Sequence, residues 1–135
     1  MKTLFKILNV VTILVVLSSV VWALQISAVP VFTAQATAAS QTSTSSAIDL
    51  RNIVNTGSFA LHYTISGSGT AALYVSTSST STGTYVTYGT AIATGKTSGT
   101  YYTPFSPPVA PFVKILVTET GGAQSVTTTA RLVVQ

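Results

Sequence analysis

Residues capable of acid–base, nucleophilic or metal chemistry are sparse in this chain. It has one histidine, His62, two acidic residues, Asp49 and Glu119, and no cysteine. A catalytic triad needs an oriented base beside a nucleophile, and no serine lies in a Gly-x-Ser-x-Gly turn. A carboxylate pair for hydrolysis would have to be Asp49 and Glu119, which fit strand ends or turns more simply. The sequence therefore predicts no enzyme, no catalytic residues, no metal site and no cofactor.

Aromatic residues offer a binding surface instead. Four tyrosines lie close together in the sequence, and a tyrosine can stack on a sugar ring or anchor a protein interface. Two further apolar residues fall on a strand face that we expect to point outward. The candidate interaction surface therefore comprises Tyr85, Tyr88, Tyr101, Tyr102, Phe112 and Leu116. The alternative is that half of these tyrosines belong to the core, and the only tryptophan, Trp22, lies outside the predicted domain.

The segment from Pro111 to Gln135 is typical of a β-hairpin. Two runs rich in β-branched residues flank Gly121-Gly122, a strong signal for a two-residue loop. This loop would set Val117 opposite Val126 and continue the same apolar face through the pairs Ile115–Thr128 and Val113–Ala130. A slip of one residue would turn that face to water.

A second hairpin is predicted around Gly67-Ser68-Gly69. Phe59, Leu61, Tyr63 and Ile65 alternate with polar or small residues ahead of this loop. The hairpin would set Ile65 against Ala71 and leave His62 opposite Tyr74 on the outer face.

The remaining strands are short. We expect them at residues 47–54, 85–88, 91–93 and 101–105, with the second and third near an edge. Prolines at 104, 107, 108 and 111 exclude a central strand there. About seven strands and no helical periodicity after residue 46 predict an all-β fold, a two-sheet antiparallel sandwich of the immunoglobulin-like kind.

The first 36 residues have the features of a signal peptide or membrane anchor helix. Lys2 and Lys6 precede an almost wholly apolar run, Ile7 to Leu24. Cleavage would follow Ala36, at the Ala34-Gln35-Ala36 site, or it would follow Ala23. The alternative is an uncleaved anchor, and this segment would then be the protein's only contact with the membrane. The sequence therefore predicts a secreted or cell-surface protein.

The segment before the predicted domain has two parts. Cleavage after Ala23 would leave Leu24–Phe32 as an apolar tail able to add a strand to a neighbouring subunit, although it also fits the end of the leader. Residues 37–46 are rich in Ser and Thr and predict an exposed linker. The domain would then occupy residues 47–135.

The charge pattern argues against nucleic acid as a partner. The cations after Ala36 are Arg51, Lys96, Lys114 and Arg131. They are scattered, whereas nucleic-acid binding uses clustered Lys and Arg.

Two runs carry a resemblance to a known group of proteins. Gly83-Thr-Tyr-Val86 and the run from Pro111 to Thr127 resemble small immunoglobulin-like β-sandwich proteins of bacterial surfaces and phage virion accessories. The resemblance covers residues 47–135 and implies no functional residues. Virion parts assemble in the cytoplasm, so the leader favours the surface or filament branch.

These observations together predict a structural or interaction role. We expect an exported subunit of an extracellular filament or surface assembly that associates with itself or with another surface protein. The alternative is a monomeric β-sandwich module that binds a glycan or a protein.

Overall fold

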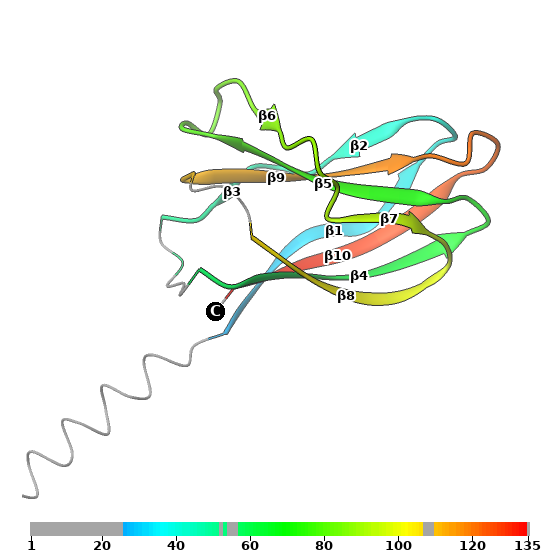
Figure 1. Cartoon of the computed structure of the whole chain (residues 1–135), viewed down its shortest axis with the longest axis horizontal. Helices are drawn as coiled ribbons and strands as arrows, with labels where there is room; N and C mark the ends of the chain where they lie inside the picture. Colours follow the sequence, from blue (N-terminus) through cyan, green and yellow to red (C-terminus); the bar gives the residue numbers. More distant parts are fainter. Residues whose placement is uncertain (1–25, 52, 54–56, 107–109, 135) are drawn as a thin grey trace, which may run out of the picture.

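Alternating apolar and polar residues build two antiparallel β-sheets that pack face to face (Figure 1). The computed structural model describes residues 26–51, 53, 57–106 and 110–134. These residues form ten strands and no helix, which confirms the all-β class and the two-sheet sandwich. No helix long and apolar enough to cross a membrane occurs in the described ranges. The apolar run Ile7 to Leu24 of the predicted N-terminal helix lies outside them.

The first sheet has four strands and contains both the first and the last strand of the described residues. Each pair of neighbouring strands in this sheet is antiparallel. Its order is β1 (Ser27–Thr37), β10 (Val126–Val134), β4 (Phe59–Gly67) and β8 (Gly99–Phe105). Strand β8 is an edge strand, the position in a sheet that tolerates Pro104.

The second sheet has six strands and is more irregular at its edges. Its main path is β2 (Thr42–Thr44), β9 (Phe112–Glu119), β5 (Ala71–Ser78) and β6 (Val86–Thr87). Off this path, β3 (Ile48–Asp49) pairs with β9, and β7 (Ala93–Lys96) pairs with β5. The strand expected over residues 47–54 is therefore only the short β3. The strand expected over residues 85–88 contains β6, whereas the one expected over residues 91–93 overlaps β7 only at Ala93.

The core lies between the two sheets and uses the inner faces that the sequence pattern predicted. Leu61, Leu73, Ile115, Val117 and Leu132 are fully buried. Tyr63 and Ile65 of β4 are also buried, as are Val113 of β9 and Val126, Ala130 and Val134 of β10. The alternation of apolar side chains is thus confirmed on β4, β5, β9 and β10.

The pairing predicted for these strands is wrong. Strands β9 and β10 belong to different sheets, so Val117 pairs with Leu73 and Ser43, and not with Val126. In the same way β4 and β5 face each other across the sandwich and form no hairpin, and His62 pairs with Arg131 and Tyr102, and not with Tyr74. Two strands joined by a loop can bury their apolar faces either side by side or stacked, and alternation alone does not distinguish these arrangements.

The sandwich begins earlier than the predicted boundary at residue 47. Ser27–Thr37 forms β1, and Thr42–Thr44, within the predicted linker, pairs with β9. The Thr42 and Thr118 hydroxyls lie 2.8 Å apart, and Ser45 donates its backbone N–H to the Ile115 carbonyl at 2.9 Å. Pairing with β9 satisfies the backbone of this Ser/Thr-rich segment, which needs little apolar surface at the edge of a sheet.

Candidate interaction surface

The outer face of the four-stranded sheet carries a continuous row of exposed side chains, which we call the outer row. Successive cross-strand pairs join its members, Pro30, Arg131, His62 and Tyr102, across β1, β10, β4 and β8. The His62 and Tyr102 rings have centroids 6.5 Å apart at 48°. Because strand residues alternate between faces, all four side chains point away from the core.

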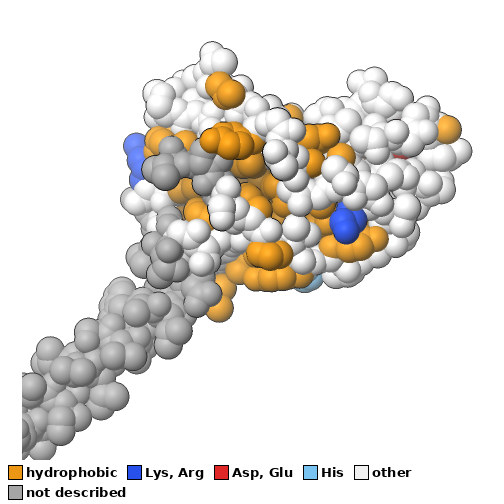
Figure 2. Space-filling model, in the orientation of Figure 1, with side chains coloured by type: hydrophobic (Ala, Val, Ile, Leu, Met, Phe, Trp, Pro, Cys, Tyr) orange, Lys and Arg blue, Asp and Glu red, His pale blue; other side chains and the backbone are white. Residues whose placement is uncertain are grey.

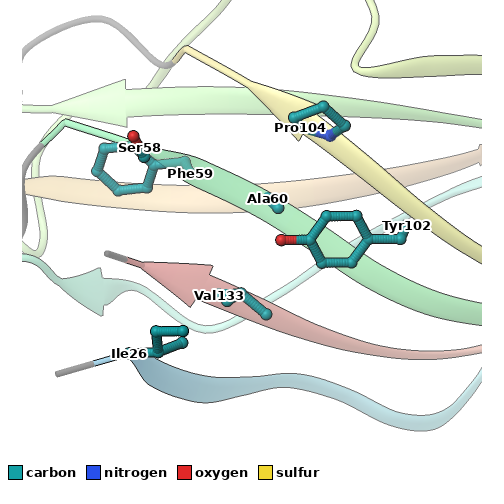
Figure 3. A pocket seen from close by; sticks show the side chains of 7 residues that line it. All are labelled: Ile26, Ser58, Phe59, Ala60, Tyr102, Pro104 and Val133. Carbon is teal, nitrogen blue, oxygen red and sulfur yellow. The ribbon is translucent and has the colours of Figure 1, made fainter. Parts of the chain in front are cut away.

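A shallow apolar hollow of about 130 Å³ lies beside the outer row (Figure 3). Its floor and walls come from strands β4, β8 and β10 and from the residues just before β1 and β4. They are Ile26, Ser58, Phe59, Ala60, Tyr102, Pro104 and Val133. The Tyr102 ring lies beside Ala60, and Val133 and Ile26 continue the surface across the neighbouring strands. Ile26 is 61% exposed and Tyr102 is 63% exposed, so the hollow has no cover among the described residues.

Arg131 has no acidic partner among the described residues. Asp49 forms an ion pair with Arg51 at 2.7 Å. Hydrogen bonds from the Arg51 side chain lower the pKa of the Asp49 carboxyl. Glu119 is buried and surrounded by backbone N–H groups. The outer row is therefore a cationic and aromatic surface.

Glu119 joins three loops at one end of the sandwich, in an arrangement we call the Glu119 clamp. Its Oε2 accepts hydrogen bonds from the backbone N–H groups of Ser40 and Gly122, both at 2.9 Å. Its Oε1 accepts from Thr70 at 3.2 Å and from Gly121 at 2.7 Å. The hydrogen bond from Ser40 contributes most to lowering the pKa of Glu119, against the opposing effect of burial. Both oxygens are thus engaged in holding loops, which is a structural role.

The structure separates the four tyrosines of the candidate surface. Tyr101 points inward, stacks on Tyr63 with centroids 5.3 Å apart and donates its hydroxyl to the Thr97 carbonyl. Tyr102, the next residue on β8, points outward. Tyr85 lies at the six-stranded sheet with the Lys114 ammonium 4.2 Å above its ring. Tyr88 follows β6 and is 47% exposed. The four tyrosines therefore do not line a single edge of the sandwich.

Phe112 and Leu116 lie on β9 and do not share a face with Arg131, because Arg131 is in the other sheet. Phe112 is buried beneath the Arg51 guanidinium, which lies 4.7 Å from its ring centroid. Leu116 is half-buried and pairs with Tyr74 and Thr44. Neither belongs to the surface around Tyr102.

Sequence reasoning missed Ile26, Pro104 and Val133 as surface residues. Ile26 falls within the predicted signal peptide or anchor, and Pro104 belongs to a proline-rich stretch for which the sequence excluded a central strand. Val133 lies on the outward side of β10, a strand whose neighbours were predicted incorrectly. The alternation along β10 does contain a signal, since Arg131 and Val133 point to the side opposite Leu132.

Hydrophobic side chains also gather along the middle of the molecular face seen in Figure 2, and Lys and Arg occur there only at separate positions. Val86 and Tyr88 are the exposed large apolar residues near the edge of the six-stranded sheet. The molecule therefore has exposed apolar residues at both sheets. Only at the outer row of the described residues do such side chains lie beside a cation, Arg131, and a histidine, His62.

Comparison with known proteins found similarity in fold only. No family model matches it, and no curated protein matches it. A chain of the structure of infectious bursal disease virus, Gx strain, is similar in fold, with a TM-score of 0.50, 15% sequence identity and 82% of this chain covered. The match covers 31% of the viral chain. The likeness supports the β-sandwich architecture described above.

Proposed function

We propose that this β-sandwich is an exported structural protein whose copies associate with one another in a surface assembly or filament. The observation that carries the proposal is the hollow on the four-stranded sheet, lined mostly by apolar residues, which no described residue covers and which has Ile26 and Tyr102 at its margin. Exposed apolar patches on a folded domain mark surfaces for packing against a partner. The similar viral chain is consistent with a structural role for this architecture.

Export through the N-terminal segment is part of the proposal. Ala36 pairs with Thr127 inside β1, so cleavage after Ala36 would remove nearly all of that strand. Cleavage after Ala23, or retention of the segment as an anchor, leaves β1 intact. We therefore favour a product that keeps Ser27–Thr37 and is secreted or held at the cell surface. Sequencing the N-terminus of the product checks this choice.

Light scattering and negative-stain microscopy of the exported protein test self-association. The expected result is oligomers or fibres that Ile26→Glu disperses, because a charge would be placed at the rim of the hollow. Val86→Glu is the matched control, since Val86 is 64% exposed but lies at the six-stranded sheet. An exported protein that is monomeric at all concentrations would overturn the proposal. If Ile26→Glu and Val86→Glu disperse the oligomers equally, the hollow is not the surface through which the copies associate.

A glycan-binding module is the second candidate, and the outer row favours it. Tyr102 offers an exposed ring for a sugar face, and Arg131, which has no acidic partner among the described residues, would attract a carboxylate. An acidic polysaccharide such as polygalacturonate is therefore the ligand class that fits this row better than a neutral glucan.

We expect Tyr102→Ala to weaken binding to polygalacturonate at least about tenfold, because it removes an exposed aromatic anchor. Tyr88→Ala is the control, since Tyr88 is an exposed tyrosine away from the outer row. Isothermal titration measures the dissociation constants. No binding by the unaltered protein, or equal loss in both variants, would contradict this candidate.

A further inference from the structure

Strand β1 is the outermost strand of the four-stranded sheet, and in that sheet it pairs with β10 alone. The pairing begins at Ser27–Val134 and ends at Thr37–Val126, and it is interrupted by two register shifts on either side of Phe32. An outermost strand with one partner can leave its sheet without breaking any other pairing of that sheet.

The connection after β1 can act as a hinge. Ser40 has φ 57° and Ala34 has φ 47°, the only described residues other than glycine with positive φ. This conformation is strained for residues with a side chain. The Glu119 carboxylate holds the Ser40 N–H, and the Glu119 N–H donates to the Gln41 carbonyl at 2.9 Å. The bond to the Gln41 carbonyl fixes the chain from Gln41 onward, so the pivot spans Thr37 to Ser40, and opening it would release the Ser40 N–H from Glu119.

Loss of β1 would leave a specific vacancy that a second copy can fill. Phe32 and Thr37 are buried, and Val29 and Val31 pack against the core. Without them the edge of β10 would expose unpaired backbone groups and an opened core. The β1 of another copy supplies the same side chains in the same register, so the contacts are conserved and only the hinge changes.

We propose that β1 is exchanged between copies of this chain, each β1 pairing with the β10 of a neighbour. This inference rests on the proposed self-association and names its mechanism. Mutual exchange between two copies closes a two-fold dimer, whereas exchange passed from copy to copy builds a linear filament. Straightening the hinge also allows Ser40 to leave its positive φ.

Engineered disulfides distinguish exchanged from unexchanged copies, because the chain has no cysteine of its own. Ala28 and Val133 are direct partners across β1 and β10 on the outer face, and Ala28→Cys with Val133→Cys would link them. In the exchanged assembly we expect most of the oxidised protein to run as covalent multimers that reduction dissolves. Each single cysteine variant should give no such multimers.

Thr64→Cys with Thr129→Cys is the matched control. These residues pair across β4 and β10, which stay in one copy whether or not β1 is exchanged, so their disulfide remains within a monomer. Pro30→Cys with Arg131→Cys provides a second β1–β10 pair if the first one folds poorly.

The outcomes separate this inference from the proposed function. Oligomers by light scattering with only monomeric disulfide species from both β1–β10 pairs would overturn strand exchange and leave self-association standing. Monomers by light scattering would overturn both. Ser40→Gly should lower the multimer fraction severalfold, because glycine adopts the closed hinge without strain; an unchanged fraction would exclude the hinge from the mechanism.

Discussion

Glu119→Gln is expected to lower the Tm of the sandwich by on the order of 10 °C or more. The carboxylate accepts four backbone hydrogen bonds from three loops. An amide keeps one oxygen and turns an NH2 group toward two backbone N–H donors that then lose their acceptor. Thermal unfolding followed by circular dichroism measures the change.

Asp49→Asn is the control for the loss of one negative charge, since it removes the other carboxylate side chain of the sequence. Asp49 forms a surface pair with Arg51, and such pairs contribute little, so we expect Tm to stay within about 2 °C. A comparable fall in both variants would show that net charge, and not the Glu119 clamp, is responsible.

The stabilisation by Glu119 should also depend on pH. Its pKa in the folded protein lies below the ordinary value of 4.5, so the contribution is fully present above that value. It is lost as the pH falls through the lowered pKa, because the folded state must then take up a proton that the unfolded state already holds. The difference in Tm between the unaltered protein and Glu119→Gln should therefore shrink below pH 4.5. A constant difference down to acid unfolding would contradict this account.

Leu132→Ala is expected to reduce the free energy of unfolding by about 2–5 kcal/mol. Leu132 is fully buried on the inner face of β10, which lies between β1 and β4. Truncation removes apolar contacts and leaves a cavity that neighbours on two strands cannot close. Urea unfolding measures the loss.

Leu116→Ala is the matched control on the other sheet. Leu116 lies on the outer face of β9 and is only half-buried, so the expected loss is at most about 1.5 kcal/mol. Equal losses at the two positions would mean that the inner and outer faces have been assigned incorrectly.

Along β4, β5, β9 and β10 the sequence was sufficient to predict which alternating apolar side chains face the core, but not which strands are neighbours. Val113, Ile115 and Val117 alternate with polar or larger outward residues, and this period of two identifies a half-buried strand wherever its partner lies. The Gly121-Gly122 pair correctly marked a connection between two strands, but this connection spans residues 120–125 and is not the two-residue hairpin loop that was predicted. The glycine pair could not indicate that the chain crosses to the opposite sheet, because this loop is held through Glu119 to Ser40 and Thr70, which lie far away in the sequence.

The candidate surface was harder to predict than the core. Tyr102 was identified by its residue type, but its neighbours His62 and Arg131 come from strands whose pairing spans distant parts of the chain. Thr42–Thr44 resembled a linker because an edge strand can be formed by hydroxyl-rich residues with little apolar content. Tertiary pairing, and not local preference, decides such segments.

The position of β1 beside β10 has a consequence for how the chain folds. Ser27 pairs with Val134, so β1 cannot complete its sheet until β10, the last strand of the described residues, has been synthesised. Such distant pairings slow folding to the range of about milliseconds to seconds. During that delay β1 remains unpaired, and a neighbouring molecule can capture it. Protein concentration while the chain is still folding should therefore control how many molecules become linked.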